Sequence, residues 1–445
     1  MLAGVFLPRL VAACIIWRTS GPSGFLTPDS PGYLALAQSL LLEGSFSDQG
    51  LANIVRTPGY PLLLVPAIAF RHPVLIAVFE NLLLAAGSAW LVWRIVSTLF
   101  PGSWAPAWAV LLYGFEPVGF LYSVKIMSET LFCAQLLLFV LLVIRFFGQP
   151  SFAKLVLAAL VLGWATYTRP VTLYLGVWLI PVFLLFPRTL PIDQRVFRAM
   201  VFVALFAFSL APWILRNAKV AEYPGFSSIS DFGLYFYSAA AVQAKLENKS
   251  FAQEQEEMGF WDDQRYLQAH PEQARWSRGQ ISRFMRTESQ RIISQHLPFY
   301  LVIHARGFVI VLFDTVATVM LQTVKLYPEH GGLLVRTIDQ GFSQALIWLM
   351  RQYPIVGMTF VLLGIQLVLY YVLALLGVRY LPLAVGSFFA SLALYFILVS
   401  GGPLASGRLR APIMPLVCIS ASVSIAKWSE ARRSRARAET QAVSI

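Results

Sequence analysis

Long apolar runs joined by short connections constrain this chain more than any other feature of its sequence. Ten clear runs occur, at 2–17, 74–99, 104–121, 130–147, 152–166, 171–186, 201–215, 355–376, 381–400 and 411–426. Within lipid, an apolar segment of about 20 residues can satisfy its backbone hydrogen bonds by forming a helix. The runs therefore predict an all-α polytopic membrane protein.

The composition agrees with a membrane protein and bears on its partners. Hydrophobic residues make up 58% of the 445 residues and charged residues only 13%, whereas a soluble domain carries about 25% charged residues. The formal net charge of +12 is expected where cytoplasmic loops are rich in Lys and Arg. We therefore expect membrane lipids and phosphates, and not nucleic acid, as partners. The cysteines Cys14, Cys133 and Cys418 lie far apart in apolar runs and predict neither a metal site nor a disulfide.

The distribution of basic residues predicts the orientation. Under the positive-inside rule, the first loop, 18–73, is extracytoplasmic and the basic tail, 427–445, is cytoplasmic. A chain that starts and ends inside crosses an even number of times. The ten clear runs satisfy this condition, and two ambiguous segments, 301–324 and 333–350, must both cross or both not cross. The expected total is about 10 to 12 spans.

Between the two groups of runs lies a charged region without a run long enough to span. We expect it to be a small extracytoplasmic insert, helical over 271–296, where arginines recur at helical spacing. The predicted organisation has four parts: an N-terminal transmembrane module (1–217), the insert (218–297), C-terminal transmembrane helices (298–426) and the basic tail (427–445).

The first loop contains an acid that could act as a base at the membrane surface. Asp29 precedes a segment in which apolar residues recur at intervals of three and four, which predicts an amphipathic helix lying in the interface. That position would suit a base whose substrate is a lipid. The alternative is that Asp29 only forms a turn or caps this helix.

Several cations and a second acid fall on the same predicted side of the membrane. Arg56 closes the first loop and suits a phosphate, although the surrounding prolines also fit a simple re-entry turn. Lys125 and Glu129 could either pair with each other or form part of a site. The remaining candidates for substrate binding are Tyr33, Tyr60, Arg169, Arg216, Arg408 and Arg410. Snorkelling explains any one of these arginines, but their convergence on one side points to an anionic ligand.

Six short motifs follow one another along the chain: Asp29-x-x-x-Tyr33-x-x-x-Ala37, Arg-Thr-Pro-Gly-Tyr-Pro-Leu from Arg56, Ser128-Glu129-Thr130-Leu131, Thr168-Arg169-Pro170, Pro212-Trp213-x-x-Arg216-Asn217 and Arg408-x-Arg410-x-Pro412-x-x-Pro415. Their order resembles the GT-C glycosyltransferases, and within them the bacterial branch related to protein O-mannosyltransferases and lipid A aminoarabinose transferases. The resemblance covers nearly the whole chain and is weakest over 218–350.

The resemblance implies a GT-C-like bundle and an inverting glycosyltransferase. The enzyme would take a sugar from a polyprenyl-phosphate donor and pass it to an extracytoplasmic acceptor, on the periplasmic face of a bacterial inner membrane. In this comparison Asp29 would accept the proton of the acceptor hydroxyl or orient that hydroxyl. Glu129 would be a second catalytic acid, and Arg56 would hold the donor phosphate. Many relatives carry a second acid where this chain has Ser30. We therefore predict no cofactor and no metal ligands, and leave a divalent-metal requirement open.

Two other functions would also require cations outside the membrane. A flippase for lipid-linked oligosaccharides is expected to place charges along a midplane pathway, whereas the mid-span sequences here are almost uncharged. An O-antigen ligase or polymerase is expected to carry its key residues in a late, large loop. Substitution of Asp29 by Asn is the discriminating test. In a transferase of this kind it should abolish sugar transfer from the polyprenyl-phosphate donor while sparing membrane insertion.

Overall fold

The computed structural model describes residues 2–48, 50–260, 262–328 and 342–443. It is built from helices, with one two-stranded antiparallel ribbon in which Ser47 pairs with Ala52 and Asp48 with Leu51. The elements of the N-terminal half are α1 (Leu2–Ser20), η1 (Gly21–Phe25), α2 (Ser30–Leu42), β1 (Ser47–Asp48), β2 (Leu51–Ala52), α3 (Gly59–Ala69), α4 (Pro73–Leu99), α5 (Ala105–Gly114), α6 (Pro117–Ser123), α7 (Glu129–Gly148), α8 (Phe152–Thr168), η2 (Pro170–Thr172), α9 (Leu175–Trp178), α10 (Ile180–Leu185) and α11 (Ile192–Ala221).

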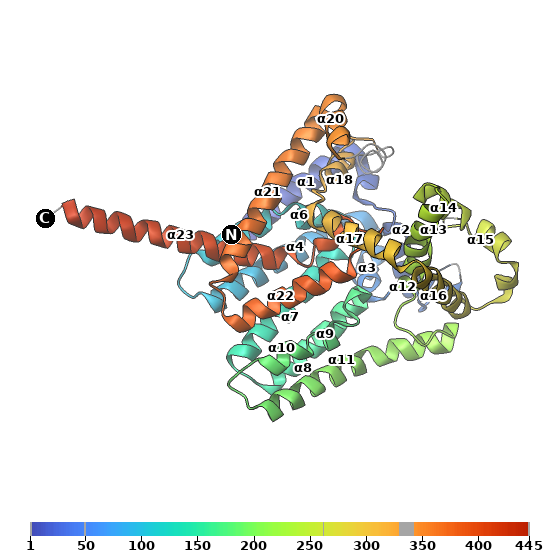
Figure 1. The fold of residues 1–445 in the computed structure, drawn as a ribbon, viewed down its shortest axis with the longest axis horizontal. Helices are drawn as coiled ribbons and strands as arrows, with labels where there is room; N and C mark the ends of the chain where they lie inside the picture. Colours follow the sequence, from blue (N-terminus) through green and yellow to red (C-terminus); the bar gives the residue numbers. More distant parts are fainter. Residues whose placement is uncertain (1, 49, 261, 329–341, 444–445) are drawn as a thin grey trace.

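The second half contains the insert and the C-terminal helices. Its elements are α12 (Ile229–Gly233), η3 (Leu234–Ala239), α13 (Ala240–Leu246), α14 (Phe251–Glu257), α15 (Asp263–Ala269), η4 (Pro271–Arg275), α16 (Arg278–Gln295), α17 (Leu297–Phe313), α18 (Ala317–Thr323), α20 (Phe342–Gln352), α21 (Pro354–Val378), α22 (Leu383–Val399), η5 (Gly407–Arg410) and α23 (Met414–Val443). Figure 1 shows the insert helices gathered to one side of the bundle.

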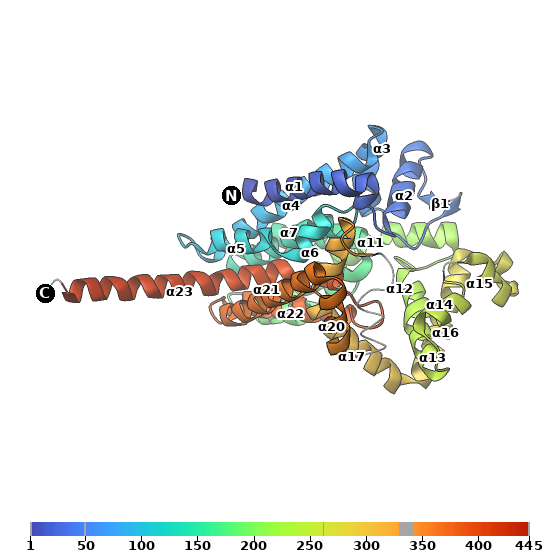
Figure 2. The ribbon, with the colours of Figure 1, turned by 90° about the horizontal axis from the view of Figure 1, so that it is seen from above.

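The long apolar helices lie side by side, and the two ends of the bundle differ. Figure 2 shows the N-terminus and the C-terminal half of α23 at one end, with α2, β1 and the insert helices at the other. The first loop and the insert, which are far apart in the sequence, therefore share one end of the molecule.

Helix α7 forms the centre of the bundle. In its most apolar 18-residue window, 67% of the residues are buried inside the protein, against 22% for α11 and α21. It packs against α4 and α8. Phe139 of α7 stacks with Phe202 of α11 and with Phe388 of α22, so this core joins the N-terminal and C-terminal transmembrane regions.

Within the described residues, five helices are long and apolar enough to cross a membrane, or six if the bent pair α16 and α17 forms one span. They are α1 with η1, α4, α7, α11 and α21. Shorter apolar helices are α3, α5, α8, α22 and the stretch from η2 to α10. The expected total of about 10 to 12 crossings therefore requires several of these shorter helices to cross as well.

Two of the predicted runs and one ambiguous segment are not single helices. The run 104–121 is divided between α5 and α6, where Glu116 caps α6 and Pro117 begins it. The run 171–186 is divided among η2, α9 and α10. The ambiguous segment 301–324 is broken between α17 and α18, where Val316 has a φ of 55°. These interruptions are local backbone features that an apolar average cannot detect.

The insert is helical as predicted, and it has a small core of its own. Serine capping boxes begin α14 and α16, with Ser250 paired to Gln253 and Ser277 paired to Gln280. The second ambiguous segment, 333–350, lies partly outside the described residues. Its described end belongs to α20.

Candidate active site

The first loop places Asp29 at the start of α2 with its carboxylate free for other partners. Asp29 occupies the N-cap position but makes no side-chain capping bond. Instead Ser30 Oγ accepts the N–H of Thr27 at 2.8 Å and donates to the carbonyl of Ile126 at 2.8 Å. The neighbouring serine therefore ties this turn to the segment before α7, and the side chain of Asp29 does not cap α2.

Both oxygens of Asp29 lie against guanidinium groups. Arg56 Nη2 is 2.9 Å from Asp29 Oδ1, and Arg408 Nη1 is 2.9 Å from Asp29 Oδ2. These residues come from opposite ends of the sequence, the first loop and η5. The Asp29 side chain is 35% exposed, so a substrate can reach it.

Glu129 lies deeper and shares Arg408 with Asp29. Its Oε1 pairs with Arg169 Nη1 and with Arg408 Nε. The Glu129 side chain is only 2% exposed, so its direct partners are the two arginines. Among the described residues Lys125 does not pair with it, and instead donates from Nζ to the Gly24 carbonyl at 2.6 Å.

The charge balance of this site favours an anion. Three cations, Arg56, Arg169 and Arg408, face two carboxylates, Asp29 and Glu129, which leaves one positive charge. Burial raises the pKa of Asp29, but Arg408 and Arg56 outweigh burial, so that the pKa lies below its ordinary value. Asp29 is therefore ionised at neutral pH.

The two candidate tyrosines support this network from one side. The Arg56 guanidinium lies over the Tyr33 ring, 4.3 Å from its centroid. Tyr33 and Tyr60 meet edge to face at 5.0 Å. Tyr60 is fully buried and accepts a hydrogen bond from Asn81 at 3.4 Å. Tyr33 therefore contacts the ionic network directly, whereas Tyr60 supports Tyr33.

Arg216 holds the first loop and lies outside the ionic network. Its guanidinium donates to the carbonyls of Asn53 at 2.6 Å and Phe46 at 2.7 Å, one on each side of the β1–β2 ribbon. Asn53 Oδ1 in turn accepts the backbone N–H of Arg56 at 2.9 Å. Arg216 thus fixes the loop that carries Arg56.

Lys125 and Arg410 also contact backbone carbonyls. Arg410 is buried and donates from Nη1 to the carbonyl of Val311 at 3.1 Å and to that of Asp314. Burial lowers the pKa of Lys125 to about 8. In this structure these two cations connect segments of the chain, and neither contacts Asp29 or Glu129 among the described residues.

Two residues that sequence reasoning did not select also support the site. Asp314 Oδ2 accepts the backbone N–H of Gly407 at 2.7 Å, which orients the residue before Arg408. Burial and then the negative charge of Asp29 raise the pKa of Tyr237, in the insert, to about 12. An acid in the middle of an ambiguous apolar segment was the only signal for Asp314. No sequence signal distinguished Tyr237.

The residues present do not fit a divalent cation. Both Asp29 oxygens are paired with arginines, and Ser30 Oγ is hydrogen-bonded to backbone groups. Within the described ranges, no group of three or more His, Cys, Asp or Glu side chains is arranged to hold a metal ion. The geometry offers guanidinium donors for a phosphate in the same place.

Comparison with known proteins agrees with this architecture. Residues 64–213 match the family model described as dolichyl-phosphate-mannose-protein mannosyltransferase. This segment includes Glu129 and Arg169, but not Asp29, Arg56 or Arg408. No curated protein matches the chain.

One similar solved structure is the archaeal oligosaccharyltransferase AglB from Archaeoglobus fulgidus, in complex with an inhibitory peptide and a dolichol-phosphate. The identity is 13% and the TM-score is 0.50, with 98% of this chain and 52% of that chain covered. The chain thus spans about half the length of that protein. The two comparisons confirm the resemblance to the GT-C superfamily and the all-α polytopic fold.

Proposed function

We propose that this protein is a glycosyltransferase that moves a sugar from a polyprenyl-phosphate donor to an extracytoplasmic acceptor. The observation that carries the proposal is the exposed Asp29 carboxylate, held between Arg56 and Arg408. A base and two phosphate-binding cations thereby meet at one point. The family match and the dolichol-phosphate named in the AglB complex support a lipid-linked donor.

The chemistry follows from this arrangement. The acceptor hydroxyl oxygen attacks the anomeric carbon, the bond from that carbon to the phosphate oxygen breaks, and the hydroxyl proton passes to Asp29. The electron pair of the broken bond leaves with the lipid phosphate. Arg56 and Arg408 stabilise the negative charge that develops there. Attack opposite the leaving group inverts the anomeric centre.

Donor binding would also prepare the base. Without donor, Arg56 and Arg408 keep the pKa of Asp29 low, which makes this carboxylate a weak base. A phosphate that engages the same guanidinium groups offsets their charge, so the pKa of Asp29 rises toward its ordinary value. Asp29 therefore becomes a better proton acceptor when the leaving group is in place.

Glu129 serves this reaction as a positioning residue. Its buried carboxylate holds Arg169 and Arg408 at once, and it keeps Arg408 oriented after Asp29 releases that arginine to the phosphate. The sequence predicted a catalytic role for Glu129; we propose instead that Glu129 acts indirectly, by orienting Arg408. Arg216, Lys125 and Arg410 were predicted to bind substrate. We propose that they instead support the loops that carry the site, because each donates to backbone carbonyls.

The site lies at the end of the bundle that also carries the insert, and we assign this end to the periplasmic face of a bacterial inner membrane. The positive-inside rule supports the assignment, since the opposite end carries the basic C-terminal helix. The insert borders the loop that carries Arg56, because Ser227 Oγ donates to the carbonyl of Val55 at 2.5 Å. This position makes the insert the candidate surface for the acceptor.

Substitution of Asp29 by Asn tests the proposal directly. Purified protein in liposomes is supplied with radiolabelled polyprenyl-phosphate monosaccharides and an envelope extract as the acceptor source. We expect D29N to lower sugar transfer by about 10²- to 10⁴-fold, the usual contribution of a general base. D48N is the matched control, because Asp48 lies in the same loop and pairs with no cation among the described residues.

Two results would contradict the proposal. Full transfer by D29N would remove Asp29 as the base. Movement of the labelled lipid across the membrane without transfer, equal in wild type and D29N, would favour a flippase.

A further inference from the structure

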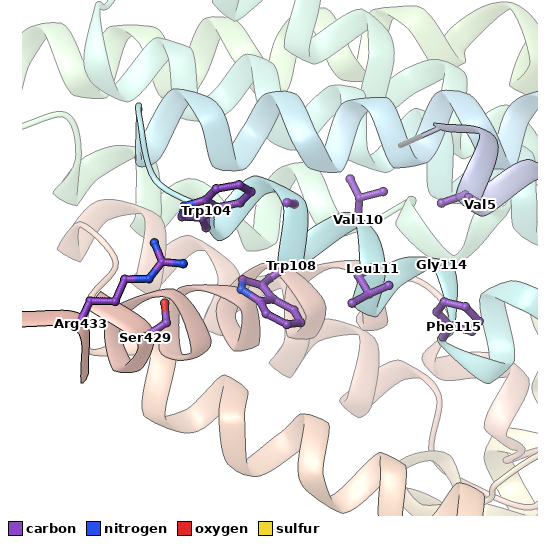
Figure 3. A pocket seen from close by; sticks show the side chains of 11 residues that line it. Val5, Trp104, Trp108, Val110, Leu111, Gly114, Phe115, Ser429 and Arg433 are labelled. Carbon is purple, nitrogen blue, oxygen red and sulfur yellow. The ribbon is translucent and has the colours of Figure 1, made fainter. Parts of the chain in front are cut away.

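A separate groove lies at the other end of the bundle, between α5, α23 and the start of α1. Its volume is about 550 Å³, and its principal side chains are Trp104, Trp108, Leu111, Phe115, Ser429 and Arg433. Figure 3 shows Arg433, Ser429 and Trp104 at one end and Leu111 and Phe115 toward the other. The groove thus has a polar end and an apolar end.

Arg433 is the available cation at the polar end. Its neighbours are engaged elsewhere, since Lys427 pairs with Glu430 at 2.9 Å and the Arg432 guanidinium lies 3.7 Å from the centroid of Trp428. Arg433 contacts no carboxylate among the side chains that the structure describes. Trp104 is 62% exposed, and tryptophan side chains are enriched at the membrane–water interface.

The opposite end is suited to hydrocarbon. Trp108, Leu111 and Phe115 are all exposed along the groove. The backbone carbonyls where α5 ends are already satisfied, because Gly114 accepts from Arg9 at 2.9 Å and Phe115 accepts from Gln366 at 2.9 Å. An acyl chain can therefore lie there without leaving a carbonyl unpaired in lipid.

We propose that this groove binds an anionic glycerophospholipid, with its phosphate at Arg433 and an acyl chain along Trp108, Leu111 and Phe115. The charge at one end and the apolar surface along the rest match the two parts of such a lipid. The groove is at the end of the bundle away from α2, so it is distinct from the proposed donor site. The inference does not depend on the glycosyltransferase activity.

Native mass spectrometry of the detergent-purified full chain tests the proposal. The protein is titrated with phosphatidylglycerol and, separately, with phosphatidylcholine of the same acyl chains. We expect phosphatidylglycerol to bind more tightly, and R433A to weaken it about fivefold, the contribution of one basic residue near an anionic lipid surface. R432A is the matched control, since Arg432 does not line the groove, and it should bind like wild type.

A second variant tests the apolar part. W108A should weaken both lipids to a similar extent, whereas R433A should weaken phosphatidylglycerol more than phosphatidylcholine, because the choline cation of phosphatidylcholine offsets its phosphate charge. Equal binding of phosphatidylglycerol by R433A and R432A would overturn the proposal. Preference for polyprenyl phosphate over phosphatidylglycerol, lost in R433A, would also overturn it, because the groove would then be a carrier-lipid site.

Discussion

Arg408 joins the exposed and buried halves of the candidate site. Its Nη1 contacts Asp29 and its Nε contacts Glu129, so separate donors of one planar guanidinium serve the two acids. Burial lowers the pKa of Arg408, but Glu129 and Asp29 outweigh burial, so its pKa lies above the ordinary value. The guanidinium is therefore permanently charged at the point where a leaving phosphate would gain charge.

Lysine in place of Arg408 keeps the charge but loses the fork. We expect R408K to lower sugar transfer by about 10²- to 10³-fold, as removal of one charge-stabilising donor does in other enzymes. The effect should appear in kcat and in donor KM. The melting temperature of the purified protein should change little, because the charge that balances the two acids remains.

Arg410 provides the control, two residues further along. It is buried against carbonyl oxygens of the α17 end, so R410K should lower the melting temperature and affect transfer only through stability. If instead R410K lowered sugar transfer without lowering the melting temperature, and R408K lowered the melting temperature, Arg410 and not Arg408 would face the substrate.

At the scale of helices and loops, the sequence predicted the helix after Asp29, the helical insert and most of the apolar runs. It also selected the five charged residues that form the ionic network, because their placement at helix ends is visible in the order of motifs. It did not separate Arg408 from Arg216 or Arg410. All three lie at helix ends, and only folding determines whether a carboxylate or a backbone carbonyl faces each one.

Gly32 in α2 and Gly59 at the start of α3 each have a packing reason that the sequence did not reveal. A Cβ on Gly59 would lie 2.7 Å from the Tyr167 carbonyl and 2.6 Å from Thr168 Oγ1, at the end of α8. A Cβ on Gly32 would lie 3.1 Å from Arg56 Nε. Each glycine therefore allows close approach to a segment that carries a cation of the site.

Alanine at Gly59 should disturb the site from a distance. Because backbone atoms block the new methyl group, α3 and the end of α8 must separate, which moves Arg169 away from Glu129. Overpacking of this kind costs about 1–3 kcal/mol of stability, and misplacement of about 1 Å can cost ~10²-fold in rate. Melting temperature and transfer rate should both fall in G59A.

The control for this substitution is G87A in α4, where no atom lies within 4 Å of the added Cβ. G87A should leave transfer unchanged and not lower the melting temperature, since alanine favours a helix over glycine. If G59A behaved like G87A, the close contact between α3 and α8 would not govern the position of Arg169.

At the scale of the whole molecule, an ion pair with a buried carboxylate joins two helices of the insert. Asp231 of α12 is 2% exposed and pairs with Arg286 of α16, at 2.8 Å to Nε and 2.9 Å to Nη2. The same carboxylate accepts from Ser282 at 2.6 Å and from Tyr223, just after α11, at 3.0 Å.

Loss of this carboxylate should loosen the insert while leaving the ionic site intact. D231N should cost about 3 kcal/mol, near the lower end for a broken buried pair because Arg286 remains 44% exposed. We expect faster proteolysis within 218–297 and a higher acceptor KM, with donor KM unchanged. E256Q is the control, since the Glu256–Arg265 pair of the insert is exposed and contributes at most about 1 kcal/mol. A rise in donor KM alone would instead assign the insert to the donor, through the hydrogen bond that Ser227 Oγ donates to the carbonyl of Val55, beside Arg56, at 2.5 Å.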